Sequence, residues 1–331
     1  HCRAPSPTSP QDVQRYLEDE EREWKDVDGV GFVNTDRTSI SLRIAVWNLR
    51  VPFEQDESTW DDRRDSVASA IAGRHPHILA TQEDCHFMNL DLENRLGSYE
   101  RYGLFNRNGE STPSLSWPIN AFSSVVGRDG EHNSVWYDSN QLTVQKEHTF
   151  WMSRSPSVPG TSFDEVTGRV VNCLLLRPKP SILVVDIFFC STHLPSGNKT
   201  RQLMSVDVIS EQFKLFHREF TTQGGEHLML VSGDFNAVPG SATHTAMIEK
   251  GFVDARSISK EKRDISGYSP TTNDWHGAKD EMIDYLWIYN YKTGSNMSVN
   301  SVKHEQISID NERTASDHKM VLVDLTLNGY A

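Results

Sequence analysis

Apolar residues recur along the chain with two different periods, which predict a mixture of helices and strands. The clearest helical pattern covers 199–220, where apolar residues return every three or four positions. A second helix is predicted over 61–74, because acidic residues begin it and Val67 and Ile71 share one face. A third is predicted over 242–250. Each of these segments can cover an apolar surface with one side.

Short apolar runs between the helices predict β-strands. These runs cover 41–47, 77–82, 133–137, 142–151, 170–176, 182–192, 228–232, 282–289 and 320–327. The turn RPKPS joins 170–176 to 182–192, which predicts a β-hairpin. Because an early strand–helix–strand unit is combined with this hairpin, we expect an α/β fold. Two mixed sheets should pack face to face with helices outside them.

Residues 1–38 differ in composition from the rest of the chain. The segment begins with HCRAPSPTSP, which is typical of disorder, and continues with a polar stretch at 11–26 that predicts a helix. We interpret 1–38 as an N-terminal appendage and 39–331 as one domain. The stretches 109–118 and 153–164 are interpreted as long loops within that domain.

The charge balance limits the classes of function. The 331 residues carry a formal net charge of −13, which argues against a protein that coats nucleic acid by bulk electrostatics. No apolar run approaches the ~20 residues that a membrane helix needs. The longest candidate, ILVVDIFFC, is short and contains Asp186. We therefore expect no membrane span, and we expect a monomer.

Cysteines and the first residues bear on localisation. The four cysteines contain no C-x-x-C pair, so a zinc site is not expected, while three disulfide pairings or none remain open. The sequence begins with His-Cys, and two N-x-S/T sequons occur, at Asn198 and Asn296. We expect a secreted protein, with a cytoplasmic one as the alternative.

Polar residues of chemically useful kinds stand at the ends of several predicted strands. They are Asn48, Glu83, His193, Asp234 with Asn236, Asp284, and Asp317 with His318. Each one alone has a simpler structural reading, such as a turn or a helix cap. Six strand ends with such residues instead indicate a site at one rim of a sheet, where α/β folds place their ligands.

The residue types in this set select the chemistry. Carboxylate and amide oxygens suit Mg²⁺ or Mn²⁺, and no cysteine ligand accompanies them. The chain has no G-x-x-x-x-G-K-[ST] loop and no G-x-S-x-G elbow, which excludes P-loop hydrolysis and the nucleophile elbow of α/β-hydrolases. The set predicts metal-assisted attack of water on a phosphate ester.

The order of these motifs resembles a known superfamily. WN at 47–48, QE at 82–83, THL at 192–194, GDFN at 233–236, IDY at 283–285 and SDH at 316–318 are similar to the endonuclease/exonuclease/phosphatase superfamily. The resemblance covers 39–327 and implies the deoxyribonuclease I-like fold, a four-layer α/β sandwich. It also implies an active hydrolase of phosphate esters. Thr81 departs from the usual Leu or Val, which changes packing only.

Three further stretches resemble one branch of this superfamily. WDDRRDSVA at 60–68, TFWMSRSPSVPG at 149–160 and GRVVNC at 168–173 resemble bacterial and fungal metal-dependent hydrolases of this superfamily. These relatives are closer to the nocturnin-type deadenylases than to deoxyribonuclease I.

The resemblance also implies which residues hold the metal. Asn48 and Glu83 would bind the principal Mg²⁺, for which Mn²⁺ could substitute, and Asp317 would help to hold it or a second ion. Arg169 and Arg50 are weaker candidates for phosphate contacts. For each arginine, a salt bridge is the alternative.

The remaining residues are assigned to the reaction by the same resemblance. Asp234 would orient or deprotonate the attacking water, Asn236 would donate to phosphoryl oxygens, and His193 would contact the scissile phosphate. Asp284 would orient His318 and raise its pKa. Whether Asp234 or His318 is the general base stays open.

Three hypotheses for the substrate remain. The first is a small, glycan-linked or lipid-linked phosphate ester, and the second is nucleic acid, with a 3′–5′ exoribonuclease as one form. Loop residues that could bind nucleic acid are Trp117, Tyr268, Trp275, Lys260, Lys262, Arg263 and Lys279. The third hypothesis, a non-catalytic binding protein, predicts a missing ligand, and the sequence has none missing. The loops 109–118, 153–164 and 254–279 are expected to set specificity.

Overall fold

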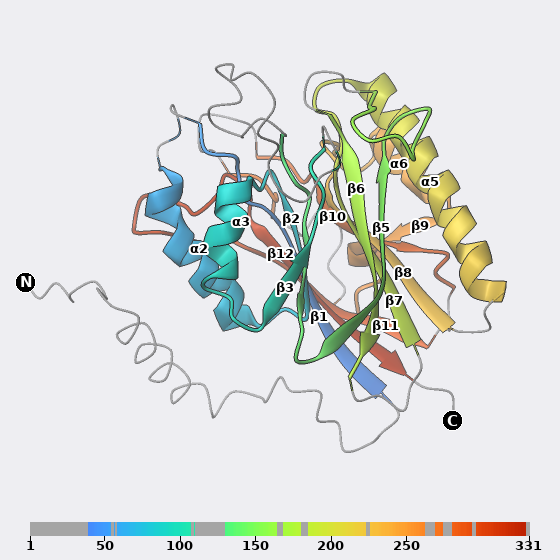
Figure 1. The fold of residues 1–331 in the computed structure, drawn as a ribbon, viewed down its shortest axis with the longest axis horizontal. Coiled ribbons are helices and arrows are strands. Elements are labelled where there is room, and N and C mark those ends of the chain that lie inside the picture. Colours follow the sequence, from blue (N-terminus) through green and yellow to red (C-terminus); the bar gives the residue numbers. More distant parts are fainter. Residues whose placement is uncertain are drawn as a thin grey trace, which may run out of the picture. The chain divides into compact units, whose positions relative to one another are not determined.

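Two six-stranded mixed β-sheets form the centre of the structure (Figure 1). The computed structural model describes residues 39–328, apart from 54–55, 57, 107–108, 110–129, 164–167, 180–184, 223–225, 262–268, 274–279 and 293–295. The predicted appendage, 1–38, lies outside the described residues. The following paragraphs concern the described part of the chain.

The first sheet has the strand order β11-β12-β1-β2-β4-β3. Its strands are β1 (Ser39–Asn48), β2 (Ile78–Gln82), β3 (Tyr99–Tyr102), β4 (Val135–Asp138), β11 (Met297–Glu305) and β12 (Met320–Asn328). β1 runs parallel to β2 and antiparallel to β12. The carboxyl ends of β1 and β2 and the start of β12 therefore share one edge of this sheet.

The second sheet has the order β5-β6-β7-β8-β10-β9. Its strands are β5 (Leu142–Trp151), β6 (Val170–Pro178), β7 (Val185–His193), β8 (Glu226–Asp234), β9 (Phe252–Asp254) and β10 (Asp284–Tyr289). β7 is parallel to β8, and β10 is antiparallel to β8. The carboxyl ends of β7 and β8 consequently lie beside the start of β10.

Helices cover the outer face of each sheet, as Figure 1 shows. α2 (Trp60–Arg74) and α3 (His86–Glu93) pack on the first sheet, while α5 (Lys199–Thr222) and α6 (Ala242–Glu249) pack on the second. A short 3-10 helix, η2 (Ala255–Ile258), follows β9. The predicted four-layer α/β sandwich of deoxyribonuclease I type is confirmed.

Local sequence explains where α2 begins and ends. Thr59 and Asp62 form a capping box, in which each side chain accepts a hydrogen bond from the other's backbone N–H. His75 ends the helix in the left-handed conformation, with φ 44°. The predicted helix over 61–74 is thus confirmed. None of the described helices is long and apolar enough to cross a membrane.

α5 covers the second sheet with an aromatic face. Phe213, Phe216 and Phe220 are buried and surround Phe188 of β7, with ring centroids 4.6 to 5.6 Å apart. Aromatic pairs at such distances add stability beyond the area they bury. The three-to-four-residue period read from the sequence is the period of this buried face.

The helices and strands predicted within the described residues all occur, and the predicted helix at 11–26 lies outside them. Five elements were not predicted: α3, β3, β9, β11 and η2. β3 and β9 have four and three residues, and both lie at sheet edges, as β11 does. Edge strands bury less apolar surface, so their sequences carry a weaker signal.

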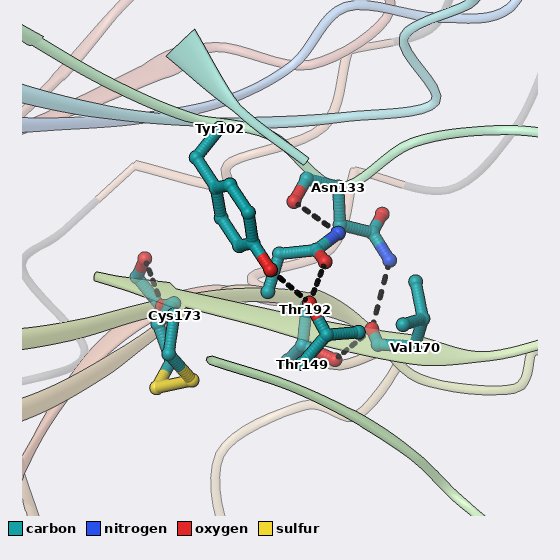
Figure 2. The surroundings of a disulfide bond; sticks show 9 residues. Tyr102, Asn133, Thr149, Val170, Cys173 and Thr192 are labelled. Carbon is teal, nitrogen blue, oxygen red and sulfur yellow. Dashed lines mark hydrogen bonds between the residues drawn. A yellow bond between two sulfur atoms is a disulfide. The ribbon is translucent and has the colours of Figure 1, made fainter. Parts of the chain in front are cut away.

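A disulfide joins the two strands of the predicted hairpin, β6 and β7. Cys173 of β6 and Cys190 of β7 are directly opposite each other in the antiparallel register, and both are buried. Figure 2 shows polar contacts nearby, where Tyr102 of the first sheet contacts the Thr149 hydroxyl of the second at 2.8 Å. Of the pairings left open by the sequence, the structure selects this one, and Cys85 is free and buried.

Candidate active site

The strand ends predicted to carry the site meet where the ends of central strands from the two sheets come together. Asn48 at the end of β1 donates from Nδ2 to Glu83 Oε1 at 2.9 Å, and to Asp234 Oδ2 at 3.2 Å. The second contact crosses from one sheet to the other. Ser191 of β7 also links the sheets, since its hydroxyl donates to the Thr81 carbonyl at 3.0 Å. The site lies at the junction of two sheets, rather than along one sheet alone.

Backbone strain marks the same strand ends. Arg50, Glu83 and Asn236 have positive φ angles of 60°, 58° and 48°. Non-glycine residues rarely adopt this conformation, and when they do they are often functional. Here it turns the chain sharply after β1, β2 and β8. The turn after β2 brings a Glu83 oxygen to within 3.0 Å of the Val51 N–H.

His318 and Asp284 form a buried pair at the centre of the site. Nδ1 of His318 donates to Asp284 Oδ2 at 2.9 Å, and the residues are 7% and 0% exposed. Burial alone would lower the pKa of His318, but the Asp284 charge and hydrogen bond raise it well above its usual value. The Trp47 indole donates to the His318 carbonyl at 3.0 Å and holds the backbone. The protonated imidazole is therefore favoured by its contact with Asp284.

Asp234 lies between the two histidines. Its Oδ2 is 3.5 Å from Nε2 of His193 and 3.8 Å from Nε2 of His318. Burial, and after it the negative charge of Asp284, raises the pKa of Asp234 to about 7. Oδ1 accepts the Asn236 N–H at 2.8 Å, which fixes the carboxylate plane. Asp234 is thus a carboxylate whose proton affinity suits proton transfer near neutral pH.

The pKa of His193 shifts in the opposite direction to that of His318. Burial, and then the nearby charge of Arg169, lowers the pKa of His193 well below its usual value. Nδ2 of Asn236 donates to Nε2 of His193 at 2.9 Å and to the Leu194 carbonyl at 3.0 Å. Arg169 is only 5% exposed, so its cation lies inside the site region and not on the open surface.

Asp317 and Arg50 lie at the more accessible side of the site. Nη1 of Arg50 is 3.5 Å from Asp317 Oδ2, and its other nitrogens contact Asp56 at 3.1 and 3.3 Å. The salt bridge that was the alternative reading for Arg50 is therefore present. Burial raises the pKa of Asp317, and the nearby Glu83 charge adds to this rise. Asp317 keeps a side-chain exposure of 21%.

The donor set fits a divalent cation. Ligand atoms of Glu83, His193 and Asp234 lie within 4.8 Å of one another, and those of Asp234, Asp284 and His318 form a second such group. Each group contains two carboxylates, and their repulsion adds to the effect of burial in raising the pKa of Asp234. A hard cation would relieve that repulsion and suits these oxygen ligands. The geometry therefore allows a metal between the two sheet edges.

Two residues near the site were not expected from the sequence. Asp56 precedes α2 and pairs with Arg50, and Arg63 lies within α2 and is completely buried. A charged residue in a polar helical stretch gives no sequence signal of burial. Only the position of Arg63 relative to Trp60 and Val67, three before and four after it, places it on the apolar face.

Of the loop residues predicted as candidates for nucleic-acid binding, the structure describes Lys260. Lys260 is exposed, and its Nζ donates to Asn300 Oδ1 at 3.3 Å. The others lie outside the described residues: Trp117, Tyr268, Trp275, Lys262, Arg263 and Lys279.

Comparison with known proteins places the chain in a class. The model of the Endonuclease/Exonuclease/phosphatase family matches residues 45–318. This range contains every strand-end residue described above. The chain belongs to this family and is an enzyme of its class, the metal-dependent hydrolases that act on phosphate esters.

Solved structures share the fold at low sequence identity. A family member from Bacteroides thetaiotaomicron has a TM-score of 0.70 at 20% identity, covering 88% of this chain and 99% of its own. A mannosyl-6-phosphatase from the same organism has a TM-score of 0.70 at 21% identity, with 86% and 99% covered. The human nocturnin catalytic domain has a TM-score of 0.62 at 17% identity, with 87% and 95% covered. No curated protein matches the chain significantly.

Proposed function

We propose that this enzyme hydrolyses the phosphate ester of a small or glycan-linked molecule, with Mg²⁺, by in-line attack of water. The observation that carries this proposal is the placement of buried Asp234 between His193 and His318, with its Oδ2 3.5 and 3.8 Å from their Nε2 atoms. A carboxylate that can accept a proton therefore lies beside an imidazole that is hydrogen-bonded to Asp284. This is the combination that attack on a phosphate requires.

Asn48, Glu83 and Asp317 would hold the metal. They stand at the ends of β1 and β2 and before β12, and their oxygens are ligands that Mg²⁺ prefers. The bound ion would neutralise phosphate charge and polarise the ester. Mn²⁺, which accepts the same ligands, is the expected substitute.

Asp234 is the general base in this proposal, and His318 is not. Burial raises the pKa of Asp234 above that of an exposed carboxylate, and its Oδ2 lies between the two histidines. The Asp284 carboxylate raises the pKa of His318, so the imidazole favours its protonated form and would stabilise developing negative charge.

His193, Asn236 and Arg169 would contact the phosphate. Asn236 Nδ2 donates to His193 Nε2 at 2.9 Å, so the two side chains lie side by side where the phosphate would bind. Arg169 supplies a permanent cation close to His193. A guanidinium favours phosphate because its planar donors match two oxygens.

The loop over 153–163 lies next to Arg169 in the structure. It lines an open hollow of about 450 Å³, formed by Ser153, Arg154, Ser155, Gly160, Thr161, Ser162 and Phe163. Met152 N donates to the Arg169 carbonyl at 3.0 Å, which attaches this loop beside the proposed phosphate site. The net charge of −13 also favours a small ester over nucleic acid. The mannosyl-6-phosphatase, which shares the fold, acts on a substrate of this kind by its name.

A substrate panel tests the proposal. It contains p-nitrophenyl phosphate, bis-p-nitrophenyl phosphate, mannose 6-phosphate, single-stranded RNA and single-stranded DNA, each with Mg²⁺, Mn²⁺ or EDTA. Asp234→Asn and Glu83→Gln should lose metal-dependent turnover, whereas the control Glu211→Gln, on the exposed side of α5, should retain it. Faster cleavage of RNA or DNA would replace the proposed substrate with nucleic acid. No metal-dependent turnover of any ester would contradict the function.

We also propose that the protein is secreted. The buried disulfide between Cys173 and Cys190 is typical of oxidising compartments. Asn198 is exposed before α5, whereas Nδ2 of Asn296 is buried. Expression in a secreting eukaryotic host should therefore give a glycan on Asn198 that Thr200→Ala removes. A protein retained in the cell, or a glycan on Asn296, would contradict this proposal.

A further inference from the structure

Arg63 is an unusual residue on the core-facing side of α2. Its neighbours Asp61 and Asp62 are exposed, but Arg63 is 0% exposed, as is Val67 one turn later. Arginine is almost never fully buried unless its donors have partners. The helix therefore directs one charged side chain into the interior beneath the active site.

The guanidinium of Arg63 binds backbone carbonyls from two distant segments. Nη1 donates to the Leu49 carbonyl at 2.6 Å and to the Ala315 carbonyl at 2.8 Å, and Nη2 donates to the Arg50 carbonyl at 2.8 Å. Leu49 and Arg50 directly follow Asn48. Ala315 comes two residues before Asp317. One side chain thus connects the two segments that carry proposed metal ligands.

A second contact connects the same segments. The Ser316 hydroxyl donates to the Asn48 carbonyl at 2.7 Å. With the Arg63 bonds, it fixes the backbone on both sides of the gap between Asn48 and Asp317. Arg50 also has a positive φ of 60°, and its carbonyl is one of those that Arg63 binds. The hydrogen bond from Arg63 thereby stabilises the strained turn after β1.

The charge of Arg63 faces the acidic site. Burial lowers the pKa of Arg63 to about 10, while the nearby carboxylates of Asp56, Asp317 and Glu83 oppose that decrease. The side chain consequently remains a cation at neutral pH. Its positive charge offsets part of the repulsion among these carboxylates.

We propose that Arg63 is a positioning residue, which sets the separation of Asn48 and Asp317 so that both can hold one Mg²⁺. The role rests on the proposed metal-dependent function. Arg63 contacts neither the metal nor the substrate, and it acts through the three carbonyls. Groups that orient metal ligands in this way typically change metal affinity by about 10- to 100-fold when they are altered.

Titration calorimetry with Mg²⁺ alone tests the role. Arg63→Lys keeps the charge but loses the planar fork, and Arg63→Gln also loses the charge. Val67→Ala is the matched control, because it removes buried volume from the same helix and leaves the three hydrogen bonds of Arg63 in place. Urea unfolding of each protein without metal measures stability separately.

We expect Arg63→Lys to bind Mg²⁺ about 10- to 100-fold more weakly than the wild type, while Val67→Ala binds within twofold. The activity of Arg63→Lys should recover at high Mg²⁺, as a raised KM for the metal with a largely restored kcat. Equal Mg²⁺ affinity in Arg63→Lys and Val67→Ala would overturn the positioning role while the metal function stands. Wild-type protein that binds no Mg²⁺ would instead overturn the proposed function, and the role of Arg63 with it.

Discussion

Gly233 is the position where the smallest change should have a large effect. It lies opposite Thr192 in the parallel pair β7–β8, with a φ of 139°. A Cβ at this position would be 1.8 Å from the Thr192 carbonyl oxygen, where real Cβ contacts under 3.0 Å essentially never occur. The next residues along the two strands are His193 and Asp234. Gly233→Ala therefore forces apart the strands that deliver these two side chains.

The size of the effect follows from this geometry. The strands must separate by about 1.2 Å, and the obstacle is backbone, which cannot rotate away. Overpacking of a well-packed interior costs about 1–3 kcal/mol, and a left-handed φ for a residue with a Cβ adds about 1–2 kcal/mol. We expect Gly233→Ala to lose about 2–5 kcal/mol of unfolding free energy. A displacement of ~1 Å at the catalytic groups should also reduce kcat/KM about 100-fold.

Two glycines provide matched controls, since a Cβ at either one meets no atom within 4 Å. Gly73 is inside α2, so Gly73→Ala should gain about 0.5–1 kcal/mol from helix propensity. Gly240 has a φ of 77°, so Gly240→Ala should show the backbone strain alone, about 1–2 kcal/mol. Urea unfolding and hydrolysis of the best substrate from the panel would be measured for all three variants.

The relative stabilities of the three variants test whether the clash at Gly233 is real. The clash argument requires Gly233→Ala to be clearly less stable than Gly240→Ala. If these two variants unfold at the same urea concentration, and Gly233→Ala keeps wild-type kcat/KM, the close approach of β7 and β8 does not constrain the site.

Three further predictions concern charge and covalent bonds. Asp284→Asn should lower kcat at least ~100-fold. The alkaline limb of its pH–activity profile should move to lower pH, because His318 loses the carboxylate that raises its pKa. An unchanged pH profile would contradict this. Burial lowers the pKa of His77 from 6.5 to about 4, so its stabilising contribution is present above pH 6.5 and lost as the pH falls towards 4. This is about 3 kcal/mol, and His77→Gln should remove that part of the acid dependence of unfolding. Replacing Cys173 and Cys190 by alanine together should cost about 3 kcal/mol in urea unfolding, given their separation of 17 residues.

The sequence by itself determined the elements and the residue types at their ends. Periodicity is a local property, so α2, α5 and the longer strands other than the edge strand β11 could be predicted from the spacing of apolar residues. The polar strand ends were visible because they interrupt apolar runs. The order of the motifs then identified the family and, with it, the two-sheet sandwich.

Only the tertiary structure decided how distant residues meet. Cys173 could have paired with any other cysteine, and strand register selected Cys190. Arg50 had two readings, and its contacts with Asp56 and Asp317 required three separate segments to be placed.

The burial of Arg63 and the close approach at Gly233 have the same origin. Arg63 stands in a polar stretch, and its three carbonyl partners come from segments up to 252 residues away. Gly233 could be read as an ordinary turn residue until the Thr192 carbonyl was placed against it. Local sequence constrains dihedral angles and the face of each element, whereas such contacts depend on how the two sheets pack. Packing is a property of the whole chain, because it must bury apolar surface and pair polar groups from many segments at once.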